Sequence, residues 1–347
     1  MEFSLFNLMS LNHADETPAE VMSMTVEAVQ LAEQVGFDIA WFAEHHFSSA
    51  SICASPLMMV AHCAPLTRTI RLGPAVVVLP LYHPLRAVQE IGMVQLMAPG
   101  RLLLGIGSGH QPHEFRSFGI DLSARAQLLH EGWDILEQGL TTGRVVYEGE
   151  HYRIPGAPLC LPSAVPPLYF AGADPSLITR AARAGATLLI SPGLRWGMDA
   201  LPAKAKVEAP YRAGGFQGAD IPLGLQRYVF VTEDAAEARL AVEAVRTLMR
   251  NTVALRTEYP PRDGVMLRAL PQEGEPSVDW LLEHAPIGSA SKVIRVLTED
   301  IRALRPSHFS LYCGFTGLGK GATLAAIDRL GRQVLPALRS AARDLLQ

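Results

Sequence analysis

Eight short apolar runs recur along the chain, and amphipathic segments of helical length lie between them. Continuous apolar runs are typical of strands in a parallel sheet that is covered on both faces. Eight such strands alternating with helices in 347 residues predict one α/β domain over 1–347, a (β/α)8 TIM barrel, with an open doubly wound sheet as the alternative. The runs are FSLFNL (3–8), FDIAWFA (37–43), IRLGPAVVVL (70–79), RLLLGIG (101–107), PLYFAG (167–172), ATLLIS (186–191), PLGLQRYVFV (222–231) and HFSLYCG (308–314).

The segments between these runs carry recognisable helix ends. Thr17, followed by Pro18 and by Glu20 three residues on, forms a capping box that opens a helix through Gln34, and Gly36 closes it. A short helix is expected to open at 55–56. Further helices are expected over 84–97, 121–138, 175–184, 234–249, 289–304 and 322–345.

Two stretches exceed what such a barrel needs. Residues 143–166 contain VVYEGEHYRI, which predicts a hairpin that turns at Glu148-Gly149 and leads into a proline-rich loop. Residues 251–287 are rich in Pro, Arg, Asp and Glu and show little periodicity. An insertion of this length before the last helix and strand predicts an active-site lid, and a merely solvated loop is the alternative.

Composition narrows the function classes. Charged residues are 18% of the chain and the formal net charge is −4, which gives no electrostatic case for nucleic acid or an anionic membrane as a partner. The four cysteines are scattered without a CxxC pair, and the first residues lack the basic start of a signal peptide, so we expect a cytoplasmic location. No apolar run approaches the roughly 20 residues needed to span a bilayer.

Two adjacent histidines and a glutamate end the second run, at Glu44-His45-His46. Successive side chains of a strand face opposite sides, so the two histidines cannot bind one metal ion, and we expect no metal site here. The same alternation predicts that His45 points into the barrel mouth while Glu44 and His46 point at the helices and hold the strand end. The carboxyl-terminal mouth is where barrel enzymes carry out their chemistry, and a histidine there suits general acid–base work or hydrogen bonding to a reacting oxygen.

Two glycine-rich segments follow strands. GIGSGHQPHEF (105–115) lacks the full spacing of a dinucleotide fingerprint, but glycines at a barrel mouth let a flat ring approach the backbone, and a plain tight turn is the alternative. GFTGLGKG (314–321) fits the GxxxxGK spacing of a phosphate loop. It lacks the following Ser or Thr and comes after the last strand, so nucleotide hydrolysis is disfavoured, although a phosphate could still bind at the helix start.

A third segment, AGADPSLITRAARAG (171–185), leads from the fifth strand directly into a helix. Free N–H groups, the helix dipole and a serine hydroxyl predict an anion pocket at this point. The alternative is that Asp174 only caps the helix.

Taken together, these residues resemble the bacterial luciferase-like flavin monooxygenase family. The similarity runs through nearly the whole chain and is most specific over 37–121, in GFDIAWFAEHHF, RLGPAVVVLPLYHPLRAVQEIGMVQLMAPGRLLLGIGSG and EFRSFGID, with weaker similarity in PIGSASKVIRVL and FSLYCGF. The resemblance implies a TIM barrel that binds FMN at its mouth. Many relatives use reduced FMN from a separate flavin reductase to activate O2.

The resemblance also implies roles for particular positions. His45 matches the active-site histidine that assists the oxygen chemistry of the flavin. The Ala75-Val76 pair matches a segment whose non-proline cis peptide bulges against the flavin ring. Gly107-Ser108 lies beside the flavin in relatives. The loop that holds the FMN phosphate in relatives corresponds to Gly172, Ala173 and Ser176.

The chain also departs from luciferase itself. Luciferase has a reactive Cys followed by Arg where this chain has Gly107-Ser108, so this chain lacks the thiol and a cation near the phosphate. Luciferase also has two acidic residues after the HPxRxA pattern, where this chain has Gln89-Glu90. Light emission and the aldehyde substrate are therefore unsupported. Relatives that use F420 share the barrel and the cis peptide, so F420 is the alternative cofactor. No convincing nicotinamide site is present, which favours a two-component arrangement.

We therefore expect a flavin-dependent monooxygenase that uses reduced FMN and O2 on a small, mostly apolar organic substrate. The alternatives are F420-dependent hydride transfer and a flavin-binding protein without turnover. In the family, the helices after the second and third strands often pair in a homodimer, and core packing of the same apolar residues is the alternative. The residues concerned are Leu57, Met58, Met59, Val60, Leu85, Ile91, Met93 and Leu96.

Overall fold

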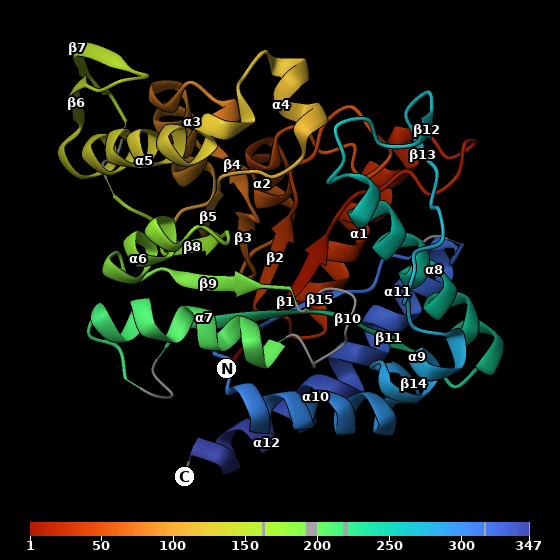
Figure 1. Ribbon diagram of the computed structural model, residues 1–347. Coiled ribbons are helices and arrows are strands. Elements are labelled where there is room, and N and C mark those ends of the chain that lie inside the picture. Colours follow the sequence, from red (N-terminus) through yellow and green to blue (C-terminus); the bar gives the residue numbers. More distant parts are fainter. Residues whose placement is uncertain (162–163, 192–199, 218–220, 316, 347) are drawn as a thin grey trace.

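The eight predicted strands are present and build one curved parallel sheet. The computed structural model describes residues 1–161, 164–191, 200–217, 221–315 and 317–346. Its main sheet has the order β3-β2-β1-β15-β10-β9-β8-β5-β4, and the strands run through the centre of Figure 1. The strands are β1 (Glu2–Asn7), β2 (Ile39–Phe42), β3 (Arg71–Pro74), β4 (Val77–Val78), β5 (Leu104–Gly107), β8 (Leu168–Ala171), β9 (Thr187–Ile190), β10 (Leu223–Tyr228) and β15 (His308–Tyr312).

The third predicted strand is split into β3 and β4, and this split brings the two ends of the sheet together. β3 pairs with β2, while β4 pairs with β5. Leu72 also pairs with Leu102, just before β5. Because the edges of the sheet meet in this way, the architecture is a nearly closed barrel, and the doubly wound alternative is wrong.

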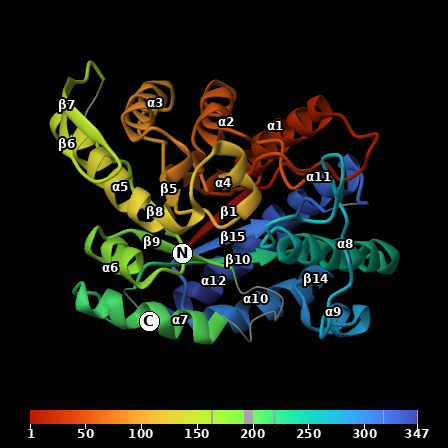
Figure 2. The same cartoon turned by 45° about the horizontal axis from the view of Figure 1, so that its top comes forward.

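Helices surround the strands as a ring, which is seen most clearly in Figure 2. Most begin or end within a few residues of the positions expected from capping signals, and the capping box of Thr17 and Glu20 is formed. The helices are α1 (Pro18–Gln34), α2 (Pro56–Cys63), α3 (Pro84–Met97), α4 (Pro112–Phe118), α5 (Arg125–Thr142), α6 (Pro175–Arg183), α7 (Ala200–Ala213), α8 (Ala235–Ala254), α9 (Val278–His284), α10 (Ala290–Leu304), α11 (Lys320–Arg329) and α12 (Leu335–Leu346). None of the helices in the described part of the chain is long and apolar enough to cross a membrane.

Three helices were not expected from the sequence, namely α4, α7 and α9, because each is short or has a weak apolar pattern. The expected helix over 322–345 is instead two helices joined by a π turn (Leu330–Val334). Gly331 in this turn lies against α1, since a Cβ added there would be 2.2 Å from a side-chain carbon of Val35. The close approach explains why the chain carries glycine at this point.

Both insertions contain regular structure. The expected hairpin is formed by β6 (Arg144–Glu148) and β7 (Arg153–Pro158), while residues 162–163 of the following loop lie outside the described residues. The 251–287 stretch holds the end of α8, a small hairpin of β12 (Arg262–Asp263) and β13 (Met266–Leu267), and α9. The following β14 (Ile287–Gly288) pairs with β11 (Phe230–Val231).

The barrel interior is filled by aromatic and apolar side chains at its base. Ile39 and Trp41 of β2 pack inside with Leu103 and Tyr169, which confirms the predicted facing of this strand. The indole N–H of Trp41 donates to Nε2 of the buried His308 at 3.2 Å, so this nitrogen must be unprotonated. Burial lowers the pKa of His308, which is therefore held neutral in the folded protein.

We expect His308 to make the protein less stable as the pH falls below about 6.5, the ordinary histidine pKa. The unfolded chain then takes up a proton that the folded chain does not, so the free energy of unfolding falls by up to about 1.4 kcal/mol per pH unit from this residue alone. Urea unfolding of the wild type and of His308→Gln at pH 7, 6 and 5 should show a shallower pH dependence for the variant. Parallel curves would contradict the prediction.

Candidate active site

The side chain of His45 stands at the carboxyl-terminal end of β2, where the strand gives way to a loop. β2 ends at Phe42, and the backbone N–H of His45 donates to the carbonyl of Cys53 at 3.3 Å. The His45 side chain is 22% exposed, whereas Glu44 and His46 on either side are buried. The half-buried His45 thus lies between two buried residues, in a segment that follows the strand and is not part of it.

Glu44 connects three elements at this end of the barrel. Its carboxylate accepts from the backbone N–H of Val78 at 3.2 Å and from the hydroxyl of Tyr82 at 3.0 Å, and it bonds Nε2 of His46 at 3.1 Å. Burial raises the pKa of Glu44, and these donors oppose the rise. The carboxylate therefore links the end of β2 to β4 and to the turn that precedes α3.

Two buried polar residues approach Nδ1 of His45 from the segment after β5. The amide Nε2 of Gln111 lies 2.9 Å from it and the Glu114 Oε1 lies 3.3 Å from it. The same Glu114 oxygen accepts from the backbone N–H of His46 at 2.8 Å. Burial favours a raised pKa for Glu114, but the bonds from His45 and His46 outweigh it and the pKa of this carboxyl is lowered.

Gln111 and Glu114 were not expected at the site from the sequence. Gln111 is the first residue before α4, but its side chain makes no capping bond and turns to His45 instead. Their partner lies more than 60 positions away in sequence, so local patterns could not identify the contact. The available signal was a group of polar residues directly after a barrel strand, which is where barrel active sites are built.

The peptide bond between Ala75 and Val76 is cis, as the resemblance implies. It lies between β3 and β4, and the backbone N–H of Ala75 donates to the carbonyl of Phe42 at 2.7 Å, next to the His45 segment. Both residues are partly exposed, and Ala75 packs on the apolar cluster inside the barrel. A Cβ added to Gly107 on β5 would be 2.7 Å from Val76 and 2.9 Å from the Ala171 carbonyl oxygen, so only glycine fits.

The surface made by these residues fits one side of a planar ring. Ala75, Val76 and the backbone at Gly107 are small or flat. The buried Ser108 follows, and its hydroxyl donates to the Gly109 carbonyl oxygen at 3.4 Å. His110 lies edge-on to His45, with ring centroids 6.5 Å apart. Burial and the nearby His45 lower the pKa of His110 to about 4.

The start of α6 differs from the expected open anion pocket. Gly172, Ala173 and Ser176 are exposed, but one oxygen of Asp174 accepts from the backbone N–H of Ser176 at 2.9 Å and from that of Leu177 at 3.2 Å. The Ser176 hydroxyl donates to the same oxygen, and it also lies 2.9 Å from Nε2 of His130. Asp174 therefore caps the helix, and the N–H groups of Ser176 and Leu177 are not free as was expected.

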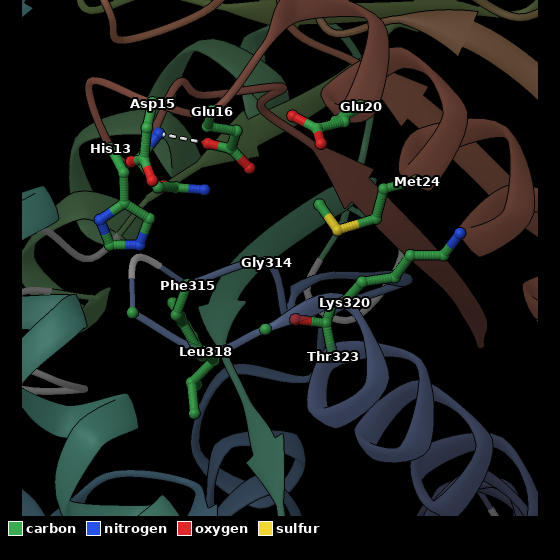
Figure 3. A pocket seen from close by; sticks show the side chains of 13 residues that line it. His13, Asp15, Glu16, Glu20, Met24, Gly314, Phe315, Leu318, Lys320 and Thr323 are labelled. Atoms are coloured by element: carbon green, nitrogen blue, oxygen red, sulfur yellow. Dashed lines mark hydrogen bonds between the residues drawn. The ribbon is translucent and has the colours of Figure 1, made fainter.

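Residues 314–315 and 317–320 of the glycine-rich segment line a separate cavity of about 460 Å³ between the loops after β1 and β15 (Figure 3). Asp15, Glu16 and Glu20 face this cavity, and the ammonium group of Lys320 bonds Glu27 at 2.5 Å. The cavity is therefore acidic and its one lysine is already paired, which does not suit a phosphate. No group of three or more His, Cys, Asp or Glu in the described ranges could hold a metal ion.

Comparisons with known proteins agree with this architecture. A family model described as luciferase-like monooxygenase matches residues 1–294. The uncharacterized protein y4vJ of Sinorhizobium fredii is 35% identical over 98% of both chains. The oxygenase component of the flavin-dependent trigonelline monooxygenase of Acinetobacter baylyi is 26% identical, over 99% of this chain and 97% of that protein.

Solved structures share the fold along nearly the whole chain. The monooxygenase RslO1 of Streptomyces bottropensis superposes with a TM-score of 0.82 at 21% identity, over 97% of this chain and 100% of that one. The oxygenating constituent of 3,6-diketocamphane monooxygenase of Pseudomonas putida, in complex with FMN, gives 0.78 at 17% identity, over 97% and 98%. An F420-dependent secondary alcohol dehydrogenase gives 0.73 at 18%, over 97% and 99%. The chain belongs to the luciferase-like monooxygenase family.

Proposed function

We propose that this enzyme is the oxygenase component of a two-component monooxygenase that uses reduced FMN and O2 on a small, mostly apolar organic substrate. The observation that carries the proposal is the contact, at the barrel mouth, between the end of β2 and the segment that joins β3 to β4. There His45 follows the end of β2, and the cis segment Ala75-Val76 is bonded to the same strand end through the Phe42 carbonyl. The carboxylate of Glu44 bonds Val78, two residues after the cis segment. A full-length relative is the oxygenase component of such a system, which supports a separate flavin reductase as partner.

The residues of the chain have distinct tasks in this proposal. The ring end of FMN would lie against Ala75, Val76, Gly107 and Ser108, and the bound flavin supplies the activation of O2. His45 would donate or accept a proton at the reacting oxygen, since its Nε2 has no hydrogen-bond partner among the described residues. The apolar barrel interior below keeps water from the reacting centre.

The phosphate end would lie against Gly172, Ala173 and Ser176. Because Asp174 already accepts the N–H groups of Ser176 and Leu177, and Nε2 of His130 bonds the Ser176 hydroxyl, the donors left for a phosphate are those of the backbone around Gly172. A carboxylate at this point opposes a dianion, so we expect modest affinity for the cofactor.

Several elements beside the mouth support a lid role for the 251–287 insertion. Arg262 of its small hairpin donates to the carbonyl of Phe47 at 2.9 Å. The backbone N–H of Ser49 donates to the Val265 carbonyl at 2.7 Å. The hairpin is thus attached to the loop that directly follows His45 and His46, where it would cover a bound substrate.

The exposed apolar residues of α2 and α3 support a homodimer. Of the residues expected at such an interface, Leu57, Met59, Val60 and Ile91 are buried in the core of the chain itself. Met58, Met93 and Leu96 are instead exposed, with 72% of Met58 and 60% of Leu96 accessible, and Leu85 is half-buried. Met97, which was not expected at the interface, is exposed beside them. Single exposed apolar residues are common, but four on two adjacent helices favour a contact with a second copy.

The cysteines support a cytoplasmic location, which is part of the proposal. All four are free thiols, as is usual in a reducing compartment.

The cofactor can be tested directly. We expect the purified protein to bind reduced FMN more tightly than reduced F420, and to consume O2 when a separate NADH-dependent flavin reductase supplies reduced FMN. Fluorescence titration and an oxygen electrode measure the two effects. Tight F420 binding without oxygen consumption would replace the proposal with F420-dependent hydride transfer, a reaction that the structural similarity to the secondary alcohol dehydrogenase also allows.

The role of His45 can be tested on any compound that a panel of aldehydes and ketones shows to be oxygenated. We expect His45→Ala to lower kcat about 10²- to 10⁴-fold, the usual contribution of a general acid or base, with little change in FMN affinity. His151→Ala, at the exposed tip of the β6–β7 hairpin, is the matched control and should leave kcat unchanged. Unchanged turnover in His45→Ala would remove this residue from the mechanism.

The dimer surface can be tested by charge. Leu96→Glu combined with Met58→Glu should convert the protein to a monomer in sedimentation velocity, because two carboxylates would be buried against the partner copy. Leu240→Glu on α8 changes a residue of similar exposure elsewhere and should leave the sedimentation coefficient unchanged. A wild-type protein that is already monomeric at micromolar concentration would contradict the proposal.

A further inference from the structure

Nδ1 of His45 faces one hydrogen-bond donor and one hydrogen-bond acceptor. The Gln111 nitrogen at 2.9 Å can only donate, whereas the Glu114 oxygen at 3.3 Å, when ionised, can only accept. A neutral imidazole nitrogen is either a donor or an acceptor, so one of the two groups must determine which of the ring nitrogens carries the proton.

The charge on Glu114 decides between them. The pKa of this carboxyl is lowered, so it is ionised at neutral pH, and it is 1% exposed. A bare Nδ1 would direct its lone pair at a buried carboxylate, which is unfavourable where the dielectric constant is low. A protonated Nδ1 would make a charge-assisted hydrogen bond, which is stronger than the neutral bond that Gln111 could donate.

Gln111 can adapt to that outcome. The oxygen and the nitrogen of a glutamine side-chain amide have nearly the same shape, so which atom is Oε1 and which is Nε2 is assigned from the hydrogen-bond network. In the orientation shown, the Oε1 of Gln111 is buried without a hydrogen-bond partner. Turning the amide by half a turn directs Oε1 to Nδ1, where it accepts the same proton as Glu114 does.

We propose that Glu114 is a positioning residue that holds His45 in the tautomer with its proton on Nδ1, so that the bare Nε2 is the nitrogen available at the barrel mouth. The use of this nitrogen in oxygenation rests on the proposed function, whereas the tautomer itself does not. Nε2 then acts as a hydrogen-bond acceptor or proton acceptor, as the free nitrogen does in histidines that are oriented by a carboxylate.

The other groups around the ring do not compete for this role. His46 is bonded to Glu44 through its Nε2, and only its backbone N–H reaches Glu114. The ring of His110 lies edge-on to that of His45, with centroids 6.5 Å apart, and its pKa is lowered, so it adds no charge beside His45 at neutral pH. His113 donates from Nε2 to the carbonyl of His46, 3.2 Å away, and burial lowers its pKa.

The tautomer can be observed by ¹⁵N NMR of the cofactor-free full chain labelled at the histidine ring nitrogens. The signals that disappear in His45→Ala belong to His45. In the wild type we expect a protonated Nδ1 and an unprotonated Nε2 at pH 7.5. Glu114→Gln, which can donate or accept equally well, should move the tautomer ratio about tenfold toward Nε2–H.

Gln111→Met is the matched control, because it removes the amide, leaves Glu114 in place and should keep the wild-type tautomer. A wild-type His45 protonated on Nε2 would overturn the proposal, as would a change of tautomer in Gln111→Met but not in Glu114→Gln. If the predicted tautomer is found while His45→Ala turns over normally, the proposed catalytic role fails and the assignment of Glu114 stands.

Discussion

The buried carboxylate of Glu44 is the interaction on which the geometry of the barrel mouth depends. A carboxylate with so little exposure is costly unless donors surround it, and here the donors come from β4, from Tyr82 and from His46. Each of these bonds fixes a different piece of backbone to the end of β2. The position of His45 and that of the cis segment are therefore set by one common anchor.

The two ends of the barrel have different physical characters. At the base, Trp41, Tyr169 and His308 pack against one another, and Glu2 pairs with Arg71 to close the layer. At the mouth, the strand ends carry small residues and polar side chains that leave part of the surface accessible. The mouth is therefore the end of the barrel that we propose for a ring-shaped cofactor, above an apolar floor.

The strands and most helix starts could be predicted from the sequence because their signals are local. Buried parallel strands are continuous apolar runs, and a capping box lies within four residues. Local signals predict less of the site. His45 was predicted from alternation along one strand, whereas Gln111 and Glu114 are distant in sequence and come close to His45 only in the folded chain. At α6 the local signal was ambiguous, since the aspartate that opens a helix also occupies the N–H groups that an anion would need.

That aspartate bears on how the enzyme would hold its cofactor. Asp174 places a negative charge at the start of α6, where the helix dipole would otherwise favour a phosphate, and Gly107-Ser108 supplies no cation to offset it. Arg180 on α6 does not compensate, because it pairs with Asp134 and Glu137 and stacks on Trp133. In the proposed function, binding of FMN would then depend more on the ring than on the phosphate. A weakly held phosphate suits an oxygenase that takes reduced flavin from a separate reductase and releases it after each turnover, rather than one that keeps a resident cofactor.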